Sequence, residues 1–157
     1  MGCSFTGHRT IQIKHRLNIK EAIARHIDMA YNEGCRDFYS GAAIGFDTLA
    51  AFEVLNYKKI HSDVRLILLI PCIDQDSKWN EEQRNDYKKL LMLADDVIYV
   101  SDSPYYDGCM QKRNRELVER CKILIAYVGR ERGGSAQTYR MAERNGRRIY
   151  NIFPLLS

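Results

Sequence analysis

The fold of this chain is decided by one stretch, Ser40-Gly41-Ala42-Ala43-Ile44-Gly45-Phe46-Asp47. A short strand-like run, residues 37–39, precedes it, and a helical pattern, residues 48–53, follows it. Small residues at a strand-to-helix turn let a ligand approach the backbone closely, and unpaired N–H groups at the start of a helix favour an anion. The stretch therefore predicts a domain that binds a phosphate-bearing ligand of the nucleotide type.

The composition is that of an ordinary soluble domain. The chain has 157 residues, of which 45% are hydrophobic and 28% charged. This length predicts a single domain over residues 1–157, and no run approaches the ~20 apolar residues of a membrane span. The N-terminal residues lack the pattern of a signal peptide. We therefore expect a cytoplasmic protein without a membrane partner.

Cysteine spacing and charge restrict the ligand further. The number of cysteines, five, is odd and none forms a C-x-x-C pair, which argues against a disulfide framework and a zinc site, so we expect no metal. The net charge of +4 suits an anion, whereas nucleic-acid surfaces are usually more basic and often carry interleaved aromatic residues. We expect a small nucleotide-like ligand and regard a nucleic-acid partner as disfavoured, while a homo-oligomer stays open.

Apolar runs alternate with helical patterns along the whole chain. Strands are expected over residues 2–6, 36–40, 64–70, 96–100, 122–128 and 148–152. Helices are expected over residues 18–32, 47–58, 79–94 and 109–120, and after the loop 129–134 up to about residue 145. This alternation predicts an α/β fold, a Rossmann-like, doubly wound and mostly parallel sheet with helices on both faces. Ligands of such sheets bind at the carboxyl ends of the strands, so the loops after strands one, two, four and five should meet.

Those four loops carry the candidate ligand-binding residues. The candidates are Gly7, His8, Arg9, Ser40, Gly41, Gly45, Asp47, Tyr105, Arg113, Asn114, Gly133, Gly134, Ser135 and Thr138. Arginine and histidine offer donors to a phosphate or a base, and a tyrosine can stack on a base. The N–H groups that follow Gly133 and Gly134 can hold a phosphate. Asp47 can either cap its helix or bind a sugar hydroxyl.

Taken together, the loop motifs resemble those of the SLOG superfamily, and most closely its YpsA-like branch of small bacterial single-domain proteins. The matching motifs are T-G-H-R at 6–9, G-x-x-x-G-x-D at 41–47, G-C-M-x-x-R-N at 108–114 and G-G-[ST] at 133–135. The resemblance spans nearly the whole chain and implies a Rossmann-like fold. The superfamily includes the DNA-processing protein DprA, whose S-G-x-A-x-G-[IF]-D motif the central stretch resembles, and the LOG-type nucleotide phosphoribohydrolases.

One departure from the LOG-type pattern concerns catalysis. Those hydrolases pair an arginine in M-x-x-R-K with a glutamate in P-G-G-x-G-T-x-x-E. Residues 110–113 match the arginine element, but Arg140 occupies the glutamate position. Because N-glycosidic cleavage passes through a positively charged state that a carboxylate stabilises, an arginine there disfavours the reaction. The candidate catalytic groups that remain are Arg113, Asp47, Asp107 and Glu143.

These observations predict a protein that binds or senses a nucleotide or a nucleotide-derived ligand, with no cofactor identified beyond that ligand. The first alternative is a hydrolase that acts on a nucleotide N-glycosidic bond, so that enzymatic activity stays open. The second alternative is the binding of single-stranded nucleic acid, in analogy with DprA. The mild net charge disfavours this second alternative, because nucleic-acid affinity depends strongly on cationic contacts to phosphates.

Overall fold

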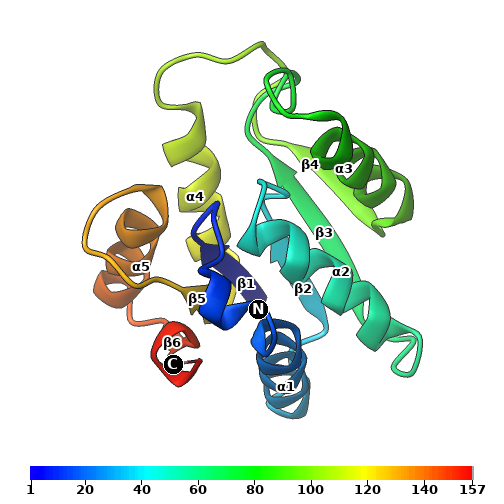
Figure 1. Cartoon of the computed structure of the whole chain (residues 1–157), viewed down its shortest axis with the longest axis vertical. Helices are drawn as coiled ribbons and strands as arrows, with labels where there is room; N and C mark the ends of the chain where they lie inside the picture. Colours follow the sequence, from blue (N-terminus) through cyan, green and yellow to red (C-terminus); the bar gives the residue numbers. More distant parts are fainter. Residues whose placement is uncertain (157) are drawn as a thin grey trace.

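Six parallel strands form one sheet in the order β4-β3-β2-β1-β5-β6 (Figure 1). The computed structural model describes residues 1–156. The strands are β1 (Gly2–Gly7), β2 (Asp37–Ser40), β3 (Arg65–Ile70), β4 (Asp96–Tyr99), β5 (Cys121–Tyr127) and β6 (Arg148–Asn151). The chain builds the sheet outward from β1 to β4 and then returns to β5 beside β1. The switch in strand order, where ligands bind in such folds, therefore lies between β1 and β5.

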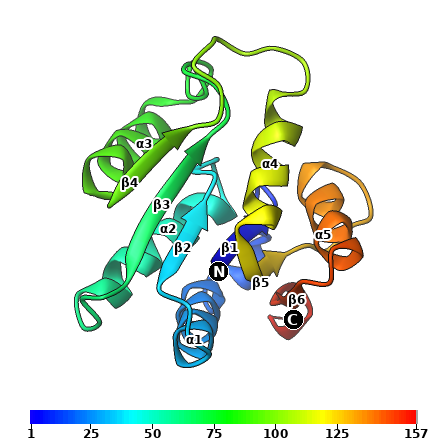
Figure 2. The same cartoon turned by 180° about the vertical axis from the view of Figure 1, so that it is seen from behind.

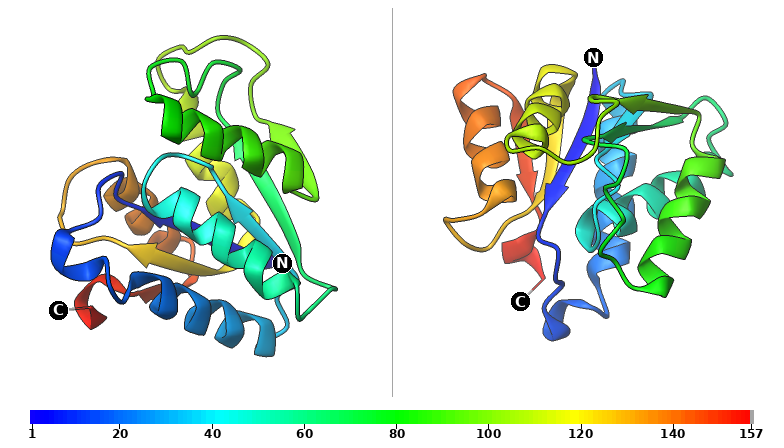
Figure 3. Two further views of the ribbon diagram at one scale, coloured as in Figure 1. Left: turned by 45° about the vertical axis from the view of Figure 1, so that its right-hand side comes forward. Right: turned by 90° about the horizontal axis from the view of Figure 1, so that it is seen from above.

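Five helices cover the two faces of the sheet. They are α1 (Ile19–Asn32), α2 (Phe46–Lys58), α3 (Glu81–Leu93), α4 (Cys109–Glu119) and α5 (Gly134–Arg144). Helix α2 packs against α1 and α3, whereas α4 packs against α5, and Figures 2 and 3 show these two groups on opposite faces. The predicted Rossmann-like fold is thus confirmed. Two short 3-10 turns, η1 (Ile13–His15) and η2 (Phe153–Leu155), were not predicted.

The apolar run of β3 shows how the sheet is buried on both faces. Residues 66–70 are all buried, and their side chains alternate between the two layers. Leu66 and Leu68 join the large cluster beneath α1 and α2. Ile67 and Leu69 pack with Leu117 of α4 on the other face. No helix of residues 1–156 is long and apolar enough to cross a membrane.

The path of the chain after β4 determines what reaches the switch in strand order. Strand β4 lies at an edge of the sheet, and the loop that follows it stays near the segment after β3, because the Ile73 N–H donates to the Ser103 carbonyl at 3.0 Å. Helix α4 then returns across the sheet and packs on β1, β3 and β5 (Figure 2). The prediction that the segment after strand four meets the other three is therefore wrong for the loop residues 101–108, whereas the part of that segment that lies in α4 approaches them.

Candidate functional site at the switch in strand order

A cavity of about 350 Å³, here called the central cavity, lies at the carboxyl ends of β1 and β5. Its lining comes from all four predicted motifs. The lining residues are Thr6, Gly7, His8, Arg9, Ala43, Asp47, Met110, Arg113, Asn114, Arg130, Gly134 and Ser135. Segments that are far apart in the sequence thus converge where the topology places a ligand.

Arg113 enters the central cavity from α4 and is only 5% exposed. Its Nη1 donates to the Gly41 carbonyl at 2.9 Å, and its Nε donates to Oδ1 of Asn114 at 2.9 Å. Nη2 has a single partner among residues 1–156, the weakly accepting Met110 sulfur at 3.9 Å. Burial lowers the pKa of the Arg113 guanidinium, yet an arginine stays protonated in proteins. The N–H groups of Nη2 are therefore left to bind an anion.

Asp47 also lines the central cavity, and the whole residue is 7% exposed. It is not the cap of its helix, because the N-cap of α2 is Gly45. Burial raises the pKa of Asp47 to about 6, and the charges of Arg113 and Arg9 oppose this rise. Within the described chain its Oδ1 has no hydrogen-bond partner, and no ion pair joins it to Arg113. A ligand that lies between these two side chains would satisfy both.

His8 positions a hydroxyl rather than donating to a ligand, contrary to its predicted role. Its Nε2 accepts a hydrogen bond from the Gly129 N–H at 2.8 Å, and its Nδ1 lies 3.1 Å from Oγ of Ser135. Burial and the charge of Arg130 lower the pKa of His8, which favours the neutral ring. Since Nε2 is the acceptor, the neutral ring carries its proton on Nδ1 and donates to Ser135. The Ser135 hydroxyl proton is therefore directed elsewhere and is available to a ligand.

The first turn of α5 is the open, cationic end of a helix. Its N-cap is Gly133, at φ +105°, and no side chain caps its first N–H groups. A Cβ at Gly133 would meet nothing within 4 Å, and one at Gly134 would lie 3.9 Å from Nδ2 of Asn114. The helix dipole and these unpaired N–H groups favour an anion, as predicted for this motif.

The glycines of the central stretch are packed against protein atoms. A Cβ at Gly41 would overlap the guanidinium of Arg113. Gly45 has φ +82°, and a Cβ there would overlap the carbonyl of Arg9. Neither glycine lines the central cavity. We predicted that these two glycines give a ligand close access to the backbone. In the structure both admit other parts of the protein, and Gly45 also lines a neighbouring cavity beside α1 and α3.

Two predicted hydroxyls are used inside the fold. Ser40 is buried, and its Oγ donates to the carbonyl of Asp47 at 3.0 Å, which holds the start of α2 against β2. Thr138 is buried, and its Oγ1 donates to the carbonyl of Gly134 at 2.9 Å, within α5. Neither residue lines the central cavity, so both hydroxyls stabilise the elements that carry the site.

Two residues predicted from the segment after β4, Tyr105 and Asp107, lie away from the central cavity, whereas Arg113 and Asn114 of the same segment line it. Tyr105 is 58% exposed, and its backbone N–H donates to Oδ1 of Asp74 at 2.9 Å. Asp107 is exposed as well. Neither side chain lines the central cavity, because this loop follows the edge strand and only α4 returns to the switch in strand order.

Several contributors to the site were not predicted, and Arg130 and Gln75 are those with long polar side chains. Arg130 lines the central cavity from the loop after β5. Its position in the sequence, just after a strand at the switch in strand order, could have identified it as a site residue. Gln75 is buried beside the cavity, where its Nε2 donates to the Gly41 carbonyl at 3.3 Å and its Oε1 accepts from Arg113 at 3.4 Å. Gln75 lies in the segment after β3. The expectation that only the loops after strands one, two, four and five meet at the site excluded this segment, so nothing in the sequence indicated Gln75.

Arg140, which replaces the LOG-type glutamate, faces a second cavity. This cavity of about 790 Å³, here called the α5 cavity, also contains Glu143. Nη1 of Arg140 donates to the carbonyl of Glu131 at 2.7 Å. Of the carboxylates in residues 1–156, Asp47 is the one that lines the central cavity. Asp107 and Glu143 do not line it, so neither takes the place of the missing glutamate there.

The parallel sheet and the cavity at its switch in strand order define the chain as a Rossmann-like α/β protein. The chain belongs to the YpsA family of SLOG proteins, whose family model, described as the YspA SLOG family, matches residues 4–155. A UPF0398 protein of Halalkalibacterium halodurans is 31% identical over 77% of this chain and 65% of its own length. The uncharacterised SPbeta prophage-derived protein YoqJ of Bacillus subtilis is 26% identical over 74% of this chain and 76% of its own.

Two solved structures share the fold. DprA from Streptococcus pneumoniae superposes with a TM-score of 0.67 and 17% identity, over 96% of this chain and 49% of that protein. DprA from Helicobacter pylori, in a structure that describes its single-stranded DNA binding mode, superposes with a TM-score of 0.66 and 18% identity, over 95% of this chain and 63% of that protein. The chain thus spans 49% and 63% of the lengths of these two DprA proteins.

These neighbours contradict our expectation that nucleic acid is a disfavoured partner. That expectation rested on the net charge of the whole chain. Net charge is a poor guide here, because binding depends on the charges that surround the ligand. Three arginines, Arg9, Arg113 and Arg130, line the central cavity against the single carboxylate of Asp47.

Proposed function

We propose that the central cavity binds one phosphate of a single-stranded nucleic acid. The observation that carries this proposal is the uncapped first turn of α5, which lines the same cavity as the arginines of three other segments. Helix N–H groups and arginines are the groups that bind phosphates in proteins. The DprA structure that describes single-stranded DNA binding favours a polynucleotide over a free nucleotide as the source of that phosphate.

The proposal assigns a role to each polar group of the cavity. The phosphate accepts from the first N–H groups of α5, from the hydroxyl of Ser135 and from Nη2 of Arg113. Arg130 contributes charge from the rim. An internal nucleotide of a DNA strand has no free sugar hydroxyl, so Asp47 would meet a phosphate oxygen. A carboxyl group with a pKa of about 6 can do this as a neutral acid that donates a hydrogen bond.

The direct test is fluorescence anisotropy with a labelled ten-residue oligothymidylate at several salt concentrations. We expect binding that weakens with salt, with a slope of log K against log salt of about −0.7 for each phosphate contact. Arg130→Ala should weaken binding by roughly fivefold. The control is Arg144→Ala, which removes the same charge. Arg144 is exposed at the end of α5 and lines none of the cavities. No binding by the wild type, or equal effects of the two substitutions, would refute the proposal.

A second candidate function, hydrolysis of the N-glycosidic bond of a free nucleotide, is favoured by Asp47 alone. Its buried carboxyl group, whose Oδ1 has no hydrogen-bond partner in residues 1–156, lines the central cavity together with Arg113. Once ionised, it would stabilise the positive charge that develops on the sugar and accept a hydrogen bond from a ribose hydroxyl. The test is release of free base from nucleoside monophosphates, measured by chromatography in the wild type and in Asp47→Asn. Equal base release by the two proteins, or none by the wild type, would eliminate this candidate.

A further inference from the structure

We propose that the single strand crosses the carboxyl edge of the sheet through three adjoining cavities, with one nucleotide or more in each. This inference rests on the proposed binding of single-stranded nucleic acid and adds the path of the strand. The path leads from a cavity beside α1 and α3, through the central cavity, to the α5 cavity. Nucleic-acid strands bind in grooves where cationic side chains follow the backbone and flat or apolar surfaces receive the bases.

Two arginines join the three cavities into one groove. Arg9 lines both the central cavity and a cavity of about 420 Å³ between α1, α2 and α3, here called the α1–α3 cavity. Arg130 lines both the central cavity and the α5 cavity. Both side chains are exposed. Each is therefore placed to contact the phosphate that links the nucleotides of two neighbouring cavities.

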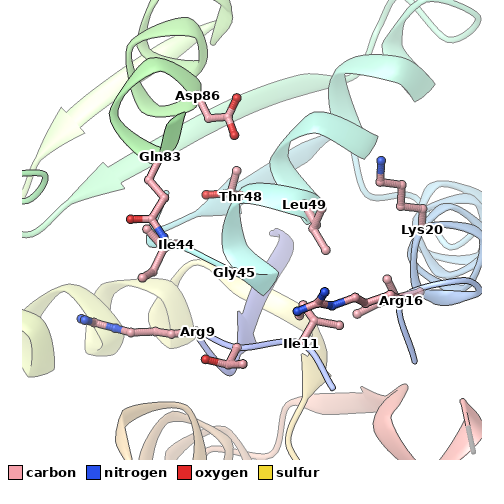
Figure 4. Close-up of a pocket in the computed structure, with 12 residues that line it drawn as sticks. Arg9, Ile11, Arg16, Lys20, Ile44, Gly45, Thr48, Leu49, Gln83 and Asp86 are labelled. Carbon is pink, nitrogen blue, oxygen red and sulfur yellow. The ribbon is translucent and has the colours of Figure 1, made fainter. Parts of the chain in front are cut away.

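The α1–α3 cavity combines an apolar floor with a cationic rim (Figure 4). Ile11, Ile44 and Leu49 supply half-buried aliphatic surface. Arg16 and Lys20 are exposed at its α1 side. Figure 4 shows Arg9 directed away from these two cations, toward the side of the central cavity. The aliphatic surface suits a base, and the cations around it suit the phosphates that flank this base.

Across this cavity, α3 offers polar groups that suit the edge of a base. Gln83 and Asp86 line the cavity opposite Arg16 (Figure 4), and both are half-buried. Asp86 is the one acidic residue in the lining, against three cations. An amide can donate to and accept from a base, so this wall is the part of the groove where a base preference could arise.

The α5 cavity repeats the combination with aromatic surface. Tyr139 and Phe153 line it and are half-buried. The ring of Phe153 is fixed by packing against His15 and Tyr127, with ring centroids 4.8 and 4.9 Å apart. A fixed, half-buried aromatic ring is a suitable surface for stacking of a base, worth ~1–3 kcal/mol for each base.

The charges of the α5 cavity are mixed but favour an anion. Three arginines, Arg130, Arg132 and Arg140, line it together with Glu131 and Glu143. All of these residues are exposed, so the carboxylates can turn toward solvent or toward the arginines when a strand binds. Arg140 stands at the position of the LOG-type glutamate. Its positive charge attracts the strand in this cavity, whereas a glutamate would repel it.

The test combines a length series with paired substitutions. Oligothymidylates of one, two, three, four, six and ten residues are titrated into the wild type, and affinity should rise until at least three nucleotides are bound. The variant Arg16→Ala/Lys20→Ala should weaken binding of the ten-residue strand by roughly tenfold and reduce the magnitude of the salt slope by about 1.4, because it removes two cationic contacts. It should leave the affinity for thymidine monophosphate unchanged.

The matched control is Arg84→Ala/Lys88→Ala. These exposed residues have the same types and the same spacing but lie on α3 outside the three cavities. On the other side, Arg132→Ala should weaken binding of the long strand, with Arg144→Ala as its control. If the wild type binds and depends on Arg130 while both cavity variants behave like their controls, the path is wrong and the proposed function stands. If the wild type binds no oligonucleotide, both proposals fail.

Discussion

Two glycine-containing turns at the carboxyl edge of the sheet each join a strand to a helix, but they have opposite surroundings. In the turn before α2, a Cβ at Gly41 would overlap the Arg113 guanidinium. In the turn before α5, a Cβ at Gly134 would lie 3.9 Å from the nearest side-chain atom, and Gly133 has open space around it. The first turn is tightly packed and holds the Arg113 side chain in place, whereas the second is the open N-terminus of a helix. A glycine at a strand-to-helix turn therefore indicates close approach but not what approaches.

Alanine at Gly41 and alanine at Gly134 test this difference most strongly. Neither glycine has a positive φ, so only the space around each differs. Gly41→Ala should lower the free energy of unfolding by about 1–3 kcal/mol, because the buried Arg113 must move. Gly134→Ala should change it by less than about 0.5 kcal/mol. Urea unfolding followed by circular dichroism measures both, and equal losses would show that the two turns are packed alike.

The same pair of variants should reverse its order when binding is measured per folded molecule. Gly134→Ala should weaken binding of the ten-residue oligothymidylate by roughly tenfold, because its methyl group would stand where a phosphate approaches the first turn of α5. Anisotropy titration at a temperature where both variants are fully folded gives the comparison. Wild-type affinity in Gly134→Ala would show that the open turn is not the phosphate site.

The pH dependence of binding should distinguish a strand from a free ribonucleotide. Since burial raises the pKa of Asp47 to about 6, the carboxyl group is neutral below that pH and charged above it. A phosphate placed beside it binds best to the neutral form, so affinity for the strand should rise roughly tenfold as the pH falls through about 6. A ribose hydroxyl that donates to the ionised carboxylate would give the opposite trend.

Asp47→Asn is the control for this pH profile, measured between pH 5 and 8. It should bind the strand with nearly constant affinity over that range. Arg113 keeps its charge throughout, and burial and the charge of Arg130 lower the pKa of His8, which favours its neutral ring. A profile that persists unchanged in Asp47→Asn would assign the titration to another group.

The smallest effect is expected at Ser135. Ser135→Ala removes one hydroxyl donor and should weaken strand binding by roughly three- to tenfold, which corresponds to about 0.7–1.4 kcal/mol. His8→Ala should have a similar effect through the same hydroxyl, and the double variant should be little worse than either single one. Additive losses would show that His8 contacts the ligand independently.

The sequence predicted the sheet well, because its strands are short apolar runs and its helices have regular apolar spacing. Predicted boundaries such as 36–40 and 109–120 lie within one or two residues of Asp37–Ser40 and Cys109–Glu119. The residues of the site were harder to predict from the sequence, because packing in three dimensions decides which small or polar residue faces the cavity. Ser40 and Thr138 have ligand-type side chains that the fold uses internally, and Gln75 reaches Arg113 from a loop that no local pattern connects with it.

Backbone chemical shifts test the central claim most directly. A uniformly ¹⁵N-labelled sample is titrated with the ten-residue oligothymidylate, and amide resonances are followed at both glycine-containing turns. We predict large shifts at Gly134, Ser135 and Ala136 and small ones at Gly41, whose surroundings are filled by protein atoms. Shifts of the reverse order, or shifts confined to residues outside the three cavities, would contradict the account.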